Sequence, residues 1–120
     1  MGAANALGSF PGEASEKALL VALGDGEVQV RWNAALSLAE HGRREGIQHL
    51  LEMTDRRNLV FFRGREVEEL RERTLVSAVR ALGRLGVRES LPRIEELARS
   101  DPNPRVQDAA LRAARDLAPK

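Results

Sequence analysis

The sequence has 120 residues, of which 42% are hydrophobic, 31% are charged and 3% are aromatic, and its formal net charge is +1. These proportions describe one folded domain and exclude a disordered chain. The lack of cysteine excludes disulfides, thiol catalysis and cysteine-ligated metals. The near-neutral charge gives no global attraction to nucleic acid or anionic lipid. Because no long apolar run or signal peptide is present, we expect a cytoplasmic protein with no membrane contact.

The N-terminal half begins with residues 1–12, which are small, weakly patterned and broken by glycine and proline. We expect this stretch to be a flexible lead-in. Apolar residues then recur at spacings of three and four, as on one face of a helix. This spacing predicts helices over residues 13–23, 27–41 and 44–54. The first two are followed by Gly24 and Gly42, a residue type that commonly ends helices.

The clearest element of the chain is a predicted helical hairpin over residues 66–98. Gly86 separates its two helices, and each helix carries a regular apolar face. Asp101 and Pro102 then resemble the start of another helix, which we expect over residues 104–117. Since a single hairpin cannot bury both of its apolar faces, it needs similar neighbours on either side.

Three of the predicted helices share one pattern. VRWNAALSLAEHG from Val30, TLVSAVRALGRLG from Thr74 and VQDAALRAARDLA from Val106 align without gaps, so that Ala34, Ala78 and Ala110 coincide. The offsets are 44 residues from Val30 to Thr74 and 32 residues from Thr74 to Val106. Two helices with two short turns need about 30 to 45 residues, which is the period of helical solenoid repeats.

The motifs in these repeats resemble HEAT repeats. They are DxxxxVRxxAAxxL from Asp25, ALGRLG from Ala81 and DPNPRVQDAALRAA from Asp101, and the short phycobilisome-lyase-like repeats of that family are the most similar. The resemblance implies an all-α fold, a right-handed α-solenoid of antiparallel helix pairs (a HEAT-like superhelix), as a single domain over residues 13–118. The order would be a leading second-type helix, two complete pairs and a trailing first-type helix.

The extra residues of the first offset fall in an inserted loop at about residues 55–65, DRRNLVFFRGR. Apolar side chains surrounded by arginine are typical of protein interfaces. We therefore consider the loop a candidate partner-binding site, with the alternative that it folds back and fills a gap beside the helices. The candidate residues are Leu59, Phe61, Phe62, Arg56, Arg57, Arg63 and Arg65.

A second departure from the family pattern is a potential apolar stripe of Trp32, Leu36 and Val76, at positions that the resemblance expects to be polar. An exposed stripe of this kind would mark a contact surface. The alternative is that the N-terminal segment, through Phe10, or the inserted loop covers it.

The resemblance also implies an Asp in the turn before each first-type helix and an Arg six residues later. Asp25 and Arg31 supply both groups in the first repeat. The aligned positions of the other two repeats depart from the pair, so we expect an incomplete ladder: they hold Glu69 with Leu75, and Asp101 with Gln107.

The sequence offers little for catalysis. His41 and His49 form no metal-binding motif, and no hydrolase elbow or phosphate loop is present. We therefore expect no enzyme activity, no cofactor and no metal, and we predict a protein–protein interaction scaffold or adaptor that binds another protein. Self-association through the unpaired end helices is a further expectation. One alternative is nucleic-acid binding through an arginine cluster near the loop, formed by Arg43, Arg44, Arg56, Arg57, Arg63 and Arg65. The other is an accessory subunit of an enzyme such as a bilin lyase, which the resemblance implies.

Overall fold

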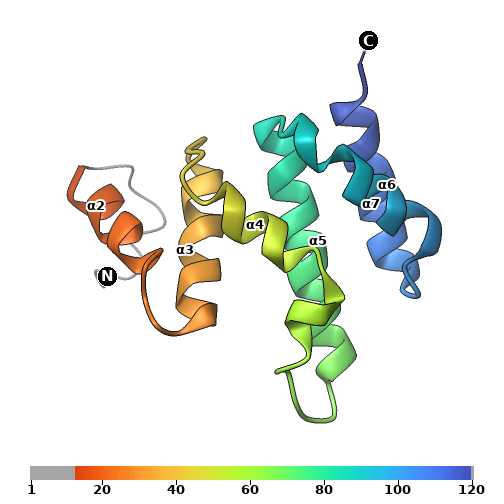
Figure 1. Cartoon of the computed structure of the whole chain (residues 1–120), viewed down its shortest axis with the longest axis horizontal. Helices are drawn as coiled ribbons and strands as arrows, with labels where there is room; N and C mark the ends of the chain where they lie inside the picture. Colours follow the sequence, from red (N-terminus) through yellow and green to blue (C-terminus); the bar gives the residue numbers. More distant parts are fainter. Residues whose placement is uncertain (1–12, 120) are drawn as a thin grey trace.

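The computed structural model describes residues 13–119, and within them it contains helices and no strands (Figure 1). The helix ends agree with the sequence prediction to within three residues. The predicted lead-in over residues 1–12 lies outside the described residues. The α-helices are α2 (Glu13–Ala22), α3 (Val28–Glu40), α4 (Ile47–Met53), α5 (Val67–Leu85), α6 (Leu91–Ser100) and α7 (Pro104–Leu117), with short 3-10 helices η1 (Arg56–Leu59) and η2 (Arg88–Ser90).

The helices form a solenoid with two faces. The first-type helices α3, α5 and α7 run side by side, and the second-type helices α4 and α6 cross in front of them (Figure 1). Helix α2 packs on α3 at one end of the row. The resulting slab measures 41 × 40 × 24 Å. The all-α solenoid that the repeat pattern predicted is therefore confirmed.

The helices stop where the sequence permits the chain to turn. Gly42 after α3 and Gly86 after α5 have φ angles of 74° and 69°, in the left-handed region that side-chain-bearing residues rarely adopt. Helix α7 starts at a polar cap, since the Oδ1 of Asn103 accepts hydrogen bonds from the backbone N–H groups of Arg105 at 2.9 Å and Val106 at 3.4 Å. These turns set the antiparallel direction of each helix pair.

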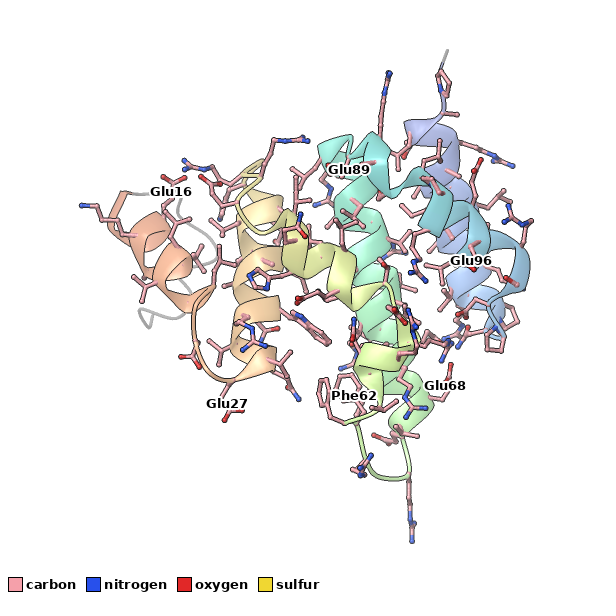
Figure 2. The ribbon with its side chains drawn as sticks, in the orientation of Figure 1. Glu16, Glu27, Phe62, Glu68, Glu89 and Glu96 are labelled. Carbon is pink, nitrogen blue, oxygen red and sulfur yellow. The ribbon has the colours of Figure 1, made fainter. Side chains whose placement is uncertain are left out.

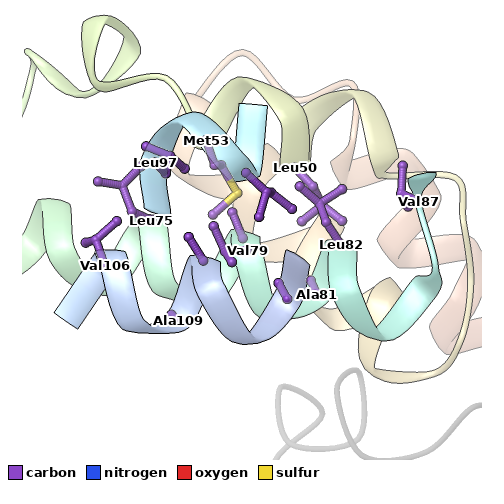
Figure 3. Packing of buried hydrophobic residues seen from close by; sticks show 14 of the residues in the cluster. Leu50, Met53, Leu75, Val79, Ala81, Leu82, Val87, Leu97, Val106 and Ala109 are labelled. Carbon is purple, nitrogen blue, oxygen red and sulfur yellow. The ribbon is translucent and has the colours of Figure 1, made fainter. Parts of the chain in front are cut away.

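The core consists of the small and aliphatic residues that recur between the repeats (Figure 3). Ala34, Ala78 and Ala110, which coincide in the sequence alignment, are all buried. Small residues also allow the helices to approach closely: a Cβ placed at Gly46 would lie 2.7 Å from the Cα of Ala35. The repeated pattern is thus explained by packing between neighbouring helices.

Candidate functional site

The inserted loop is an ordered structure between α4 and α5. Asp55 begins it, and its Oδ1 accepts a hydrogen bond of 2.9 Å from the backbone N–H of Arg57, which starts the 3-10 helix η1. Leu59, at the end of η1, is fully buried. The chain then turns at Gly64, whose φ of 107° requires glycine, and enters α5 at Val67.

The loop covers the only tryptophan of the chain. The ring centroid of Phe61 lies 5.6 Å from that of Trp32, and that of Phe62 lies 4.5 Å from Phe61. The indole Nε1–H of Trp32 donates a hydrogen bond of 3.5 Å to the Oε1 of Glu52, and Trp32 is only 4% exposed. The loop therefore covers Trp32 within the stripe, whereas the alternative cover through Phe10 lies outside the described residues.

The candidate contact residues consequently divide by exposure. Trp32 and Leu59 are buried in the core cluster, at 4% and 0% exposed. Leu36 and Val76 are half-buried on the first-type face. Phe61 and Phe62 are half-buried. Figure 2 shows the side chain of Phe62 at the loop. Contact through the half-buried and exposed members stays a prediction.

Val60 is the most exposed apolar residue of the loop, at 60%. The sequence analysis did not select it. It follows the buried Leu59 and precedes Phe61, which faces Trp32, so its own side chain points away from the core. The exposed Arg63 and Arg65 lie just beyond it. Sequence spacing did not distinguish Val60 from its neighbours, because all of residues 59–62 are apolar.

Arg56 joins the loop to the third repeat. Its Nε and Nη2 donate to the two carboxylate oxygens of Asp101 at 2.7 and 2.9 Å, and its Nη1 and Nη2 donate to Glu68 at 3.1 and 3.0 Å. These hydrogen bonds raise the pKa of Arg56 above its usual range, with Asp101 the larger cause. They also lower the pKa of Glu68, with a further contribution from Asn103. Arg56 is therefore a structural residue.

The remaining arginines of the predicted cluster are also mostly paired. Arg57 donates to Asp55 at 2.7 Å and lowers the pKa of that carboxyl to about 2. Arg43 forms ion pairs with Glu45 at 2.7 Å and Glu16 at 3.0 Å. Arg44 donates to the backbone carbonyl of Leu85 at 2.6 Å. Among the arginines of the cluster, Arg63 and Arg65 form no ion pair with a carboxylate in the described part of the chain.

The turn aspartates show where the sequence alignment and the structure differ. Asp25, Asp55 and Asp101 each accept a hydrogen bond from the backbone N–H two residues later, at 2.8, 2.9 and 3.0 Å. Asp55 is thus the turn residue of the second repeat. The alignment placed Glu69 there, because it was anchored on the helices and the insertion separates Asp55 from α5. The signal that could have found Asp55 was its place directly after the second-type helix α4.

The side chain six positions after the turn aspartate donates a hydrogen bond to the backbone carbonyl of that aspartate. Arg31 donates to the carbonyl oxygen of Asp25 at 2.8 Å, and Gln107 donates to that of Asp101 at the same distance. Glutamine can therefore replace arginine here, since both supply an N–H donor at that reach. The arginine and its turn aspartate form a local bond within one repeat.

The described residues hold no cluster of three or more His, Asp or Glu side chains suited to a metal. The Nδ1 of His49 is buried and lies 3.5 Å from the Oε1 of Glu52 without forming an aligned hydrogen bond. None of the helices in residues 13–119 is long and apolar enough to span a bilayer.

Comparison with protein families identifies the repeats. A model described as HEAT repeats matches residues 1–71, and one described as PBS lyase HEAT-like repeat matches residues 75–100. No curated protein and no solved structure was found to match the chain. HEAT repeats typically form scaffolds that bind other proteins, and they are usually non-catalytic. The chain belongs to the HEAT-repeat family, which the match over more than half of its length establishes.

Proposed function

We propose that this protein is a non-enzymatic scaffold or adaptor that binds another protein, and that the tip of its inserted loop is a contact site. The observation that carries the proposal is Val60, an apolar side chain 60% exposed and followed by the exposed Arg63 and Arg65. An apolar residue with adjacent arginines is the composition found at the centres of interfaces.

The anchoring of the loop supports this role. Phe61 packs against Trp32 on one side, and Arg56 binds Asp101 on the other. Both contacts fix the loop before a partner arrives, so that binding does not have to order it. Figure 1 shows that the loop between η1 and α5 extends beyond the ends of the helices, where a partner can reach it.

Photo-cross-linking would test the proposal. The photoreactive residue p-benzoylphenylalanine at position 60 should give a discrete cross-linked protein in the organism's own cells, and Arg63→Glu with Arg65→Glu should abolish it. The same residue at position 21 provides the control, because Val21 is exposed on α2, far from the loop (Figure 1). Identical cross-links from both positions, or none from position 60, would contradict a specific role for the tip.

The alternatives receive less support. The nucleic-acid hypothesis needs several unpaired arginines close together. However, Arg43, Arg56 and Arg57 already form ion pairs with carboxylates. A bilin-lyase accessory role rests on the name of the repeat type that matches residues 75–100. A fold-level name does not identify a reaction. Self-association through the end helices is considered with α7 in the Discussion.

A further inference from the structure

A line of arginines follows the exposed side of α5. Arg73, Arg80 and Arg84 are seven and four residues apart, which places them on one face of the helix. All three are exposed, and we call this set the α5 arginine ridge. Because α5 is the middle first-type helix, the ridge lies at the centre of the face formed by α3, α5 and α7 (Figure 1).

Two clefts flank the ridge. The larger, about 1080 Å³, lies between α5 and α7, and the smaller, about 270 Å³, lies between α3 and α5. Arg80 and Arg84 border both clefts. The larger cleft has a floor of small residues, since Gly83 meets Ala113 closely enough that a Cβ on the glycine would lie 3.2 Å from the alanine Cβ. A ligand can therefore approach the helix backbones between the long charged side chains.

The ridge arginines differ from their neighbours in lacking partners. On the opposite wall of the larger cleft, Arg105 pairs with Glu72 at 3.4 Å and Arg112 pairs with Asp108 at 3.3 Å. No carboxylate of the described residues forms an ion pair with Arg73, Arg80 or Arg84. Their guanidinium groups form no internal ion pair, so their N–H donors are available to an external acceptor.

The spacing of the ridge suits carboxylates carried on a polypeptide. A helix rises about 1.5 Å per residue, so Arg80 and Arg84 are about 6 Å apart along the axis and Arg73 lies about 10 Å further on. Side chains two residues apart in an extended segment, or four apart in a helix, match the distance between Arg80 and Arg84, and side chains three or seven apart, respectively, match the longer distance to Arg73. Each carboxylate can accept two parallel N–H bonds from one guanidinium.

The surroundings favour a protein over a nucleic acid. Glu69 and Asp116 border the same cleft as the ridge, and their carboxylates would repel the continuous negative charge of a phosphate backbone. A protein segment can place acidic residues on the ridge and neutral or basic residues beside these carboxylates.

We infer that the first-type face binds an acidic segment of a partner protein, with its carboxylates on Arg80 and Arg84 and the segment lying in the cleft between α5 and α7. The inference rests on the proposed scaffold function and names a surface and a ligand chemistry for it. This face has a role separate from that of the loop tip at Val60. The loop precedes the N-terminal end of α5, whereas Arg80 and Arg84 lie near its C-terminal end.

Titration with a fluorescein-labelled peptide that alternates glutamate with serine, (Glu-Ser)5, at low salt would test the inference. We expect saturable binding that weakens at least about tenfold in Arg80→Glu with Arg84→Glu, because two attractions become two repulsions. Arg80→Lys with Arg84→Lys should bind at an intermediate level, since lysine keeps the charge and loses the paired donors. All of these positions are exposed, and unchanged urea unfolding would show that the variants fold.

The matched control is Arg88→Glu with Arg99→Glu, which makes the same change in net charge at exposed positions outside both clefts. An equal loss of (Glu-Ser)5 binding in the control would overturn the inference, as would the absence of saturable binding. Tighter binding of a DNA duplex that is lost in the ridge variant would assign the face to phosphate and also overturn it. Cross-linking from position 60 is measured separately in the same ridge variant. Failure of this inference can therefore be told apart from failure of the loop proposal.

Discussion

Gly46 occupies a position where a side chain has no room. A Cβ built there would lie 2.7 Å from both the Cα and the Cβ of Ala35, so the N-terminal end of α4 would have to move away from α3. We expect Gly46→Ala to lower the free energy of unfolding by about 1 to 3 kcal/mol, as overpacking of a core does. Gly26→Ala is the control, because nothing lies within 4 Å of its added Cβ. Urea unfolding of the two variants measures the difference, and equal stabilities would contradict the close contact.

Asp55 should contribute to the loss of stability in acid. Its hydrogen bond with the Arg57 side chain is the main cause that lowers its pKa in the folded state from 3.8 to about 2. A carboxyl with a lowered folded-state pKa stabilises the fold above its unfolded-state pKa, and this stability is lost as the pH falls from about 4 toward 2. Asp55→Asn keeps the oxygen that accepts from the Arg57 backbone and removes the charge.

We therefore expect the wild type to exceed Asp55→Asn in stability at pH 6 by less than about 1 kcal/mol, because Arg57 is 83% exposed and solvent weakens the pair. The difference should shrink between pH 4 and pH 2, as measured by urea unfolding at each pH. Asp25→Asn serves as the control, since Asp25 forms the same turn without an ion pair to an arginine side chain in the described residues. A difference for Asp55→Asn that does not vary with pH would contradict the assignment.

At the scale of elements, two adjacent arginines of η1 should have different effects on stability. Arg56 binds Asp101, whose side chain is only 2% exposed, whereas Arg57 binds Asp55 at the surface. Arg56→Ala leaves a buried carboxylate without its cation, so we expect a loss of about 2 kcal/mol or more. Arg57→Ala should cost clearly less, because solvent screens the exposed pair. Thermal or urea unfolding of this matched pair tests whether the inserted loop stabilises the third repeat; losses of the same size would argue against it.

The loop's cover over Trp32 can be followed by fluorescence, because Trp32 is the only tryptophan in the chain. Phe61→Ser removes the ring that lies 5.6 Å away and should admit water to the indole. The emission maximum should then shift to longer wavelength. Val60→Ser, at the adjacent exposed position, should leave the spectrum unchanged. An unshifted spectrum in Phe61→Ser would mean that other groups suffice to exclude water.

The sequence predicted the helices well and the loop's contacts poorly, for a physical reason. Leu38 and Leu82 occupy matching positions in two repeats, and both are fully buried, so a periodic pattern is enough to find the core. The bond from Arg56 to Asp101 joins residues 45 positions apart and belongs to no repeat. The contact of Trp32 with Phe61 likewise pairs a helix residue with an insertion. Such contacts depend on how the solenoid places the loop, which no local spacing encodes.

At the scale of the whole molecule, one exposed side of α7 differs from the matching sides of α3 and α5. In α3 the matching positions hold Trp32, Ala35 and Ala39, which are buried. The aligned residues of α7 are the exposed Asp108, Leu111 and Arg115. Charged residues at these positions reduce the apolar surface that α7 offers to another copy of the chain. They argue against self-association through α7, although Leu111 is 46% exposed.

Restoring the internal pattern should therefore create an interface. Asp108→Val with Arg115→Ala would leave Leu111 at the centre of an apolar side like that of α3, and we expect concentration-dependent self-association in sedimentation velocity. The wild type should sediment as one species over the same concentrations. Glu95→Val with Arg99→Ala makes similar changes at exposed positions of α6, where no equivalent packing side exists, and should not self-associate. The wild type would contradict this expectation if it already associates and the α7 changes weaken that association. These charged residues would then belong to an interface.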